Sequence, residues 1–130
     1  MPVIPKGIAS YRQTEVESRT PLELVVMLYD GALRFMGDAC DAIERRDIPA
    51  RRDALGRALA IVAELQNTLN LEAGGEIAAA LDRLYAYSNT RLLDAAAQND
   101  ARPIAEVRQL FSTLREGWHT ISTESGGPAR

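Results

Sequence analysis

The sequence predicts an all-α fold, specifically an antiparallel up-down bundle of four helices preceded by a short N-terminal segment. Four stretches of the 130-residue chain repeat apolar residues at alternating steps of three and four, which is the spacing of an amphipathic helix. Short connections separate the stretches, and consecutive helices joined by short connections pack antiparallel. No stretch shows the alternation typical of a strand. Aromatic residues make up only 5% of the chain, so we expect a core of Leu, Ala, Ile and Val.

The first helix is expected to begin at Thr20. Thr20 and Glu23 have the spacing of a capping box, in which each side chain accepts a hydrogen bond from the other residue's backbone N–H. Pro21 suits the first helical position, where its missing N–H costs nothing. Two adjacent apolar seams follow, and a helix with two seams must bury a wide face. One seam consists of Leu22, Val26, Tyr29, Leu33, Met36, Cys40 and Ile43. Arg45 and Arg46 suit the C-terminal end, where the helix dipole favours positive charge.

The second and third helices are separated by a pair of glycines. A turn is predicted at 47–49, and the second helix is expected to fade at Asn70. Because Gly74 and Gly75 disfavour a continued helix, the third helix is predicted to run from about Glu76 to Ala97. Its main stripe consists of Ile77, Leu81, Leu84, Ser88, Leu92 and Ala95.

The fourth helix is expected to follow a turn at Asn99 and Asp100, with Asp100 as the N-cap. Pro103 is tolerated because it falls in the first turn. The periodic pattern ends at Ile121, so we predict a bundle over residues 20–121. Residues 1–19 are expected to form a separate lead-in segment, and residues 122–130, rich in Ser, Gly and Pro, a disordered tail.

Composition argues against several classes of protein. The net charge is −3 and there is no basic stripe, so nucleic acid is not an expected partner. No apolar stretch approaches the roughly 20 residues that span a bilayer, and no signal peptide precedes the helices. We therefore expect no membrane insertion and a cytoplasmic location.

The residues that carry metal, cofactor or acid–base chemistry are sparse. Cys40 is the only cysteine and is expected to be a small buried apolar side chain rather than a reactive thiol. His119 is the only histidine, so a histidine-based metal site is not expected. No glycine-rich phosphate-binding motif is present. We predict no cofactor, no metal and no catalytic residue, and a function in binding rather than as an enzyme.

Four motifs, in order along residues 8–121, resemble those of the flagellin-specific export chaperone family, FliS. They are Ile8-Ala9-Ser10-Tyr11 with Val16-Glu17-Ser18; the stretch 24–33; Glu64-Leu65 with Leu69-Asn70; and the stretch 81–87 with Arg91-Leu92-Leu93 and Asn99-Asp100. Trp118 also falls where the family commonly has tryptophan. The resemblance implies an antiparallel four-helix bundle that binds the disordered C-terminal segment of flagellin in the cytoplasm. It also implies that binding prevents premature polymerisation and delivers flagellin to the flagellar type III export gate.

The resemblance implies a hydrophobic groove for flagellin between the second and third helices. The candidate groove residues are Ile61, Leu65, Leu69, Leu81, Leu84 and Tyr85. Some of the six must belong to the core instead, and Leu65 and Leu84 are the ones expected there. Ile8 and Tyr11 match the family's N-terminal segment, which can cap the empty groove; permanent packing on the bundle is the alternative. Residues 88–90 depart from the family by being less apolar and less basic.

A second function remains open from the residues. A bundle with an apolar groove could serve as a general adaptor for another export protein, or could form a homodimer through that groove. Dependence on the C-terminal segment of flagellin would separate these alternatives from a flagellin chaperone.

Overall fold

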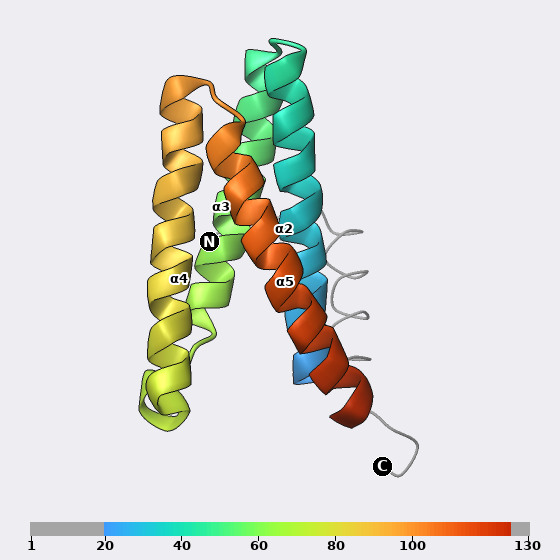
Figure 1. Ribbon diagram of the computed structural model, residues 1–130, viewed down its shortest axis with the longest axis vertical. Coiled ribbons are helices and arrows are strands. Elements are labelled where there is room, and N and C mark those ends of the chain that lie inside the picture. The colour runs from blue at the N-terminus through green and yellow to red at the C-terminus, as the bar shows by residue number, and fades with distance from the viewer. Residues whose placement is uncertain (1–19, 126–130) are drawn as a thin grey trace, which may run out of the picture.

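The computed structural model describes residues 20–125, which form four helices and no strand. They are α2 (Pro21–Glu44), α3 (Ile48–Asn67), α4 (Leu71–Gln98) and α5 (Arg102–Ser125). Helix α2 packs against α3 and α5, and α4 completes the ring by packing against the same two helices. Consecutive helices run in opposite directions (Figure 1). The predicted all-α four-helix bundle is therefore confirmed.

Helix α2 begins as its sequence predicts. The Glu23 backbone N–H donates to the Thr20 hydroxyl oxygen at 3.1 Å, and the Thr20 N–H donates to the Glu23 carboxylate at 3.2 Å. This reciprocal pair is a capping box, and Pro21 occupies the first turn. Glu44 ends the helix, and Arg46 then takes a left-handed conformation with φ 58°.

The turn expected at 47–49 lies earlier in the chain. Asp47 is the N-cap of α3, and its carboxylate accepts a hydrogen bond from the Ala50 N–H at 3.1 Å. Ile48 and Pro49 already belong to the first turn of the helix. The backbone N–H groups of the first turn have no partner within a helix. A proline there therefore removes no helical hydrogen bond, and an aspartate before it can accept a hydrogen bond from one of the free N–H groups.

Helix α4 starts one turn before the predicted Glu76. Asn70 caps it by accepting a hydrogen bond from the Ala73 N–H at 3.0 Å. The expected interruption is nevertheless real, because Gly75 has φ 54° and ψ −135° and kinks the helix. The prediction overlooked Asn70 as a cap and took the glycine pair as the end of one element rather than a kink inside another.

Substitution of Gly75 tests this kink. Gly75→Ala is expected to lower the free energy of unfolding by about 1–3 kcal/mol, since this backbone conformation is nearly confined to glycine. Nothing lies within 4 Å of the new methyl group, so the cost is conformational rather than steric. Gly117→Ala is the matched control: that site in α5 is also open but has no positive φ, so alanine should stabilise by up to ~1 kcal/mol. Urea unfolding measures both, and a loss of equal size at the two sites would contradict the kink.

Helix α5 continues to Ser125, beyond the predicted end at Ile121. The helix starts at Arg102, and Ala101 rather than the predicted Asp100 is the N-cap position, since its carbonyl accepts the Ala105 N–H at 2.9 Å. The Asp100 carboxylate still contributes at this end by accepting the Arg102 N–H at 2.9 Å. Ser122 is buried against the bundle, which explains why the polar composition of the last turn does not end the helix. The prediction that residues 122–125 belong to a disordered tail is therefore wrong. Residues 1–19, including Ile8 and Tyr11, and residues 126–130 lie outside the described part.

The core lies along the bundle axis and is built from all four helices. Its fully enclosed side chains include Tyr29, Met36, Leu65, Val62, Tyr85, Leu92, Ile104, Val107 and Phe111. Gly31 lets α3 approach α2 closely, because a methyl group at that position would lie 3.1 Å from the Ile61 Cδ1 atom. Ser88 is also fully buried, and its hydroxyl donates to the Leu84 carbonyl at 2.9 Å, so it fits the core without an unpaired proton.

Cys40 is partly buried and packs against the core. Burial raises the pKa of its thiol, although the nearby Arg108 guanidinium opposes this shift. The thiol is therefore protonated at neutral pH, as expected of an apolar packing residue.

Candidate binding site at the open end of the bundle

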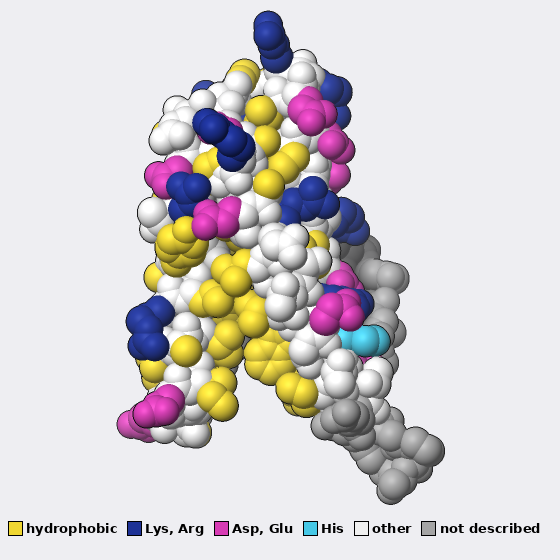
Figure 2. Space-filling view, viewed as in Figure 1, with side chains coloured by type: hydrophobic (Ala, Val, Ile, Leu, Met, Phe, Trp, Pro, Cys, Tyr) yellow, Lys and Arg dark blue, Asp and Glu magenta, His cyan; other side chains and the backbone are white. Residues whose placement is uncertain are grey.

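One end of the bundle is open. In an antiparallel arrangement this end gathers the start of α2, the end of α3, the start of α4 and the end of α5, and Figure 1 shows α4 and α5 diverging there. Apolar side chains are exposed in the hollow between them (Figure 2). The hollow contains a cavity of about 490 Å³. Its lining residues are Val25, Leu65, Thr68, Leu69, Asn70, Ala73, Gly74, Ile77, Ala78, Leu81, Tyr85 and Trp118.

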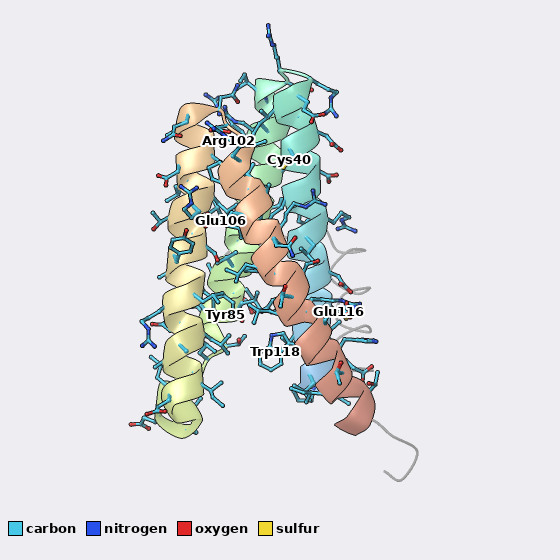
Figure 3. All side chains as sticks on the ribbon, in the orientation of Figure 1. Cys40, Tyr85, Arg102, Glu106, Glu116 and Trp118 are labelled. Atoms are coloured by element: carbon cyan, nitrogen blue, oxygen red, sulfur yellow. The ribbon has the colours of Figure 1, made fainter. Side chains whose placement is uncertain are left out.

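Interactions between α4 and α5 concentrate at the other end. The Arg91 guanidinium donates to the Glu106 carboxylate at 2.6 Å, and the Tyr87 hydroxyl donates to the same carboxylate at 2.6 Å. These two hydrogen bonds hold the pKa of Glu106 below its usual value. Figure 3 shows Glu106 where the two helices are close, and Tyr85 and Trp118 further along, where they separate. The helices are thus joined at one end and apart at the other.

The walls of the cavity are apolar and come from every helix. Val25 contributes from α2, Leu69 follows α3, Leu81 lies on α4 and Trp118 on α5. Ile77 stands at the rim of the cavity with 73% of its surface exposed. An exposed apolar surface of this kind, lined by aliphatic and aromatic side chains, is typical of a site that binds a protein segment.

An aromatic cluster forms the floor. The Tyr29 and Tyr85 hydroxyls are 2.7 Å apart and share one hydrogen bond, and the Phe111 ring centroid lies 5.0 Å from that of Tyr29. The Trp118 ring centroid lies 6.4 Å from that of Tyr29. Burial raises the pKa of both tyrosines, so both hydroxyls stay protonated over the physiological range.

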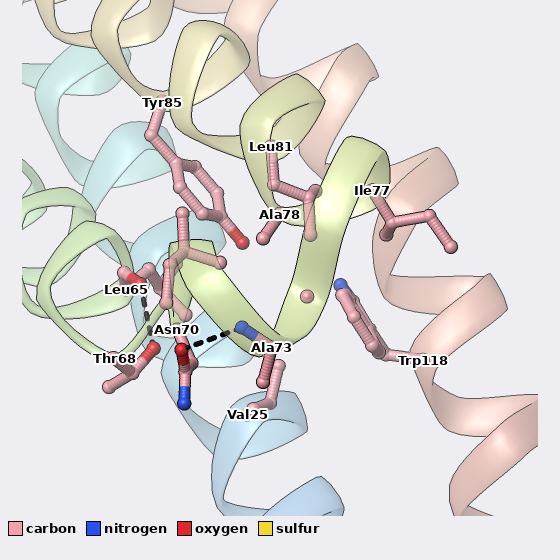
Figure 4. Close-up of a pocket in the computed structure, with 12 residues that line it drawn as sticks. Val25, Leu65, Thr68, Asn70, Ala73, Ile77, Ala78, Leu81, Tyr85 and Trp118 are labelled. Carbon is pink, nitrogen blue, oxygen red and sulfur yellow. Dashed lines mark hydrogen bonds between the residues drawn. The ribbon is translucent and has the colours of Figure 1, made fainter.

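The Trp118 indole N–H is buried without a hydrogen-bond partner among the described residues. It lies near enough to the Tyr29 oxygen to oppose the rise in the Tyr29 pKa, but not in hydrogen-bonding geometry. Figure 4 shows the Tyr85 hydroxyl and the Trp118 ring nitrogen directed toward the space between the lining residues. The floor of a largely apolar cavity therefore presents hydrogen-bond donors.

The structure brings together four of the six residues that the sequence suggested for a groove. Leu65, Leu69, Leu81 and Tyr85 line the cavity. Ile61 does not, because it packs against α2 beside Gly31, and Leu84 is turned toward the core. Leu65 and Tyr85 are almost fully enclosed, so they form the base of the cavity rather than its rim.

Sequence reasoning missed the contributions of α2 and α5. The sequence placed Trp118 only at a position where the family commonly has tryptophan and Ile77 only in the stripe of the third helix, and Val25 was not singled out. The antiparallel topology was the available signal. It places the start of the first and third helices beside the end of the second and fourth, which is where these residues meet.

Two further findings bear on function. None of helices α2–α5 is both long and apolar enough to cross a membrane. Over residues 20–125, no three His, Cys, Asp or Glu side chains are grouped so that they could hold a metal ion. The fold and the site together define a small helical bundle whose apolar end is suited to binding a protein segment.

Comparison with known proteins identifies the family. The family described as flagellar protein FliS matches residues 5–125. The chain is 40% identical over 124 residues to the flagellar secretion chaperone FliS of Salmonella typhimurium, covering 92% of each chain. It is 36% identical over 121 residues to FliSB of Pseudomonas aeruginosa, covering 90% of this chain and 96% of the relative. FliS of Bacillus subtilis is 37% identical over 109 residues, covering 84% and 80%. The chain belongs to the flagellar protein FliS family.

Proposed function

We propose that this protein is a cytoplasmic export chaperone for flagellin. It binds the disordered C-terminal segment of newly made flagellin, prevents premature polymerisation and delivers flagellin to the flagellar type III export apparatus. Membership of the FliS family supports the chaperone role, since its relatives are named flagellar secretion chaperones. The observation that carries the proposal is the largely apolar cavity of about 490 Å³ at the open end of the bundle.

The chemistry of the cavity suits a disordered ligand. A flexible segment gains free energy from each apolar side chain that it removes from water, at roughly 25 cal/mol per Å², and this gain must offset the cost of ordering the segment. Leu69, Leu81 and the exposed Ile77 offer such contacts on neighbouring helices. We place one anchoring part of the flagellin segment in this cavity. The rest of the segment would contact other surfaces of the bundle.

Titration calorimetry against monomeric flagellin of the host bacterium tests the proposal. Full-length flagellin should bind in a one-to-one complex with a negative heat-capacity change, the mark of apolar burial. Flagellin without its C-terminal segment should not bind. Equal binding of the two flagellins, or no binding by the folded protein, would contradict the proposal and favour the adaptor function. Sedimentation of the protein alone at increasing concentration would then test for a homodimer.

The N-terminal segment provides a separate prediction. We propose that Ile8 and Tyr11 cap the empty site and that flagellin displaces them, as the family resemblance implies. Deletion of residues 1–12 should therefore tighten flagellin binding or leave it unchanged, because no competing segment remains. Calorimetry of the truncated protein measures this. Loss of binding by a truncated protein that still folds would show instead that these residues contribute to the flagellin site.

A further inference from the structure

The aromatic cluster at the floor of the cavity has more hydrogen-bond donors than it can pair. Tyr29 and Tyr85 carry one O–H proton each and Trp118 carries one N–H proton. The single hydrogen bond between the tyrosine hydroxyls, at 2.7 Å, uses one of these protons. Among the described residues, the other hydroxyl proton has no acceptor in hydrogen-bonding geometry, and neither has the indole N–H.

The position of the two tyrosines shows where an acceptor could come from. Tyr29 has no exposed surface and Tyr85 only 2%, but Tyr85 lines the cavity whereas Tyr29 lies behind it. If the Tyr29 hydroxyl donates to Tyr85, the Tyr85 proton is free to point into the cavity. The Tyr29 oxygen is then free to accept from the Trp118 N–H. One acceptor placed in the cavity would thus allow all three protons to be paired.

The surroundings select the kind of acceptor. Among the described residues, none that lines the cavity carries a charge. Burying a carboxylate of the ligand there is therefore costly, because no lining side chain carries a charge that could pair with it. A main-chain carbonyl is neutral, and an extended segment carries one unpaired at every residue.

We propose that the flagellin segment places a main-chain carbonyl oxygen at the floor of this cavity, where it accepts a hydrogen bond from the Tyr85 hydroxyl. This inference rests on the proposed function and adds a polar anchor to an apolar site. The hydrogen bond to flagellin fixes the direction of the Tyr29–Tyr85 bond. Trp118 then completes the network by donating to Tyr29.

A matched pair of variants tests the proposal. Tyr85→Phe and Tyr87→Phe each remove one hydroxyl from α4 and one hydrogen bond within the protein, to Tyr29 and to Glu106 respectively, and thermal unfolding checks that both variants fold. Only Tyr85→Phe removes the donor that faces the cavity. It should weaken flagellin binding about tenfold, because a buried carbonyl in the complex loses its partner, whereas Tyr87→Phe, outside the cavity, should stay within about twofold. Calorimetry with full-length flagellin measures both dissociation constants, and equal losses would overturn the proposal.

A second measurement needs no variant. Trp118 is the only tryptophan, so the ¹⁵N-labelled protein gives a single indole N–H signal. Saturation with flagellin should move the indole proton downfield and slow its exchange with solvent. An unchanged signal in the saturated complex would overturn the proposal while leaving flagellin binding established. Absence of binding by the unmodified protein would remove the proposed function and this inference together.

Discussion

Phe111→Ala is expected to destabilise the protein by about 3–5 kcal/mol, the range for removing a buried aromatic ring. Phe111 has no exposed surface, and its ring centroid lies 5.0 Å from Tyr29 and 6.1 Å from Tyr85. Its loss opens a void where α2, α4 and α5 meet. Domains of this size have total stabilities of about 5–15 kcal/mol, so the loss is a large share. Thermal unfolding followed by circular dichroism should show a midpoint lowered by about 10–20 °C.

Ile121→Ala is the control on the same helix. Ile121 is 45% exposed and is absent from the core, so its truncation should cost less than ~1 kcal/mol. Midpoints that fall equally in the two variants would mean that the aromatic cluster does not hold α5 on the bundle. A selective loss in Phe111→Ala would show that it does.

The features that the sequence predicted correctly are mostly local. The capping box needs only Thr20 and Glu23, three residues apart, and their spacing determines it whatever the rest of the chain does. Helix boundaries were wrong where two local signals compete. Asn70 caps a helix that Gly75 then kinks, and the sequence showed the glycine more clearly than the cap.

The candidate site was harder to predict because helix rotation decides it. Leu81 and Leu84 belong to one predicted stripe and both pack against the core, yet only Leu81 also lines the cavity. Rotating the helix about its own axis by a few tens of degrees would exchange these positions, and the periodicity of the sequence does not determine the rotation that closely. The divergence of α4 and α5 depends equally on tertiary contacts, such as the Arg91–Glu106 pair at the closed end.

Ile77→Asp is expected to weaken flagellin binding about 100-fold, or by ~3 kcal/mol, without unfolding the protein. Ile77 is 73% exposed, so the substitution removes little that stabilises the bundle. The new carboxylate would stand at the rim of a cavity whose described lining contains no charged side chain that could pair with it. The bound segment would then have to bury a charge where it had buried an aliphatic side chain.

Ile48→Asp provides a matched comparison. It makes the same chemical change at an exposed isoleucine, but in the first turn of α3, at the opposite end of the bundle from the cavity. A carboxylate there faces a helix N-terminus, which tolerates negative charge, so stability and flagellin affinity should both stay close to those of the unmodified protein. Calorimetry of the two variants separates a site at the open end from a general effect of added charge. Comparable losses of affinity would place flagellin on other surfaces of the bundle, whereas a loss confined to Ile77→Asp ties binding to the cavity that four helices build together.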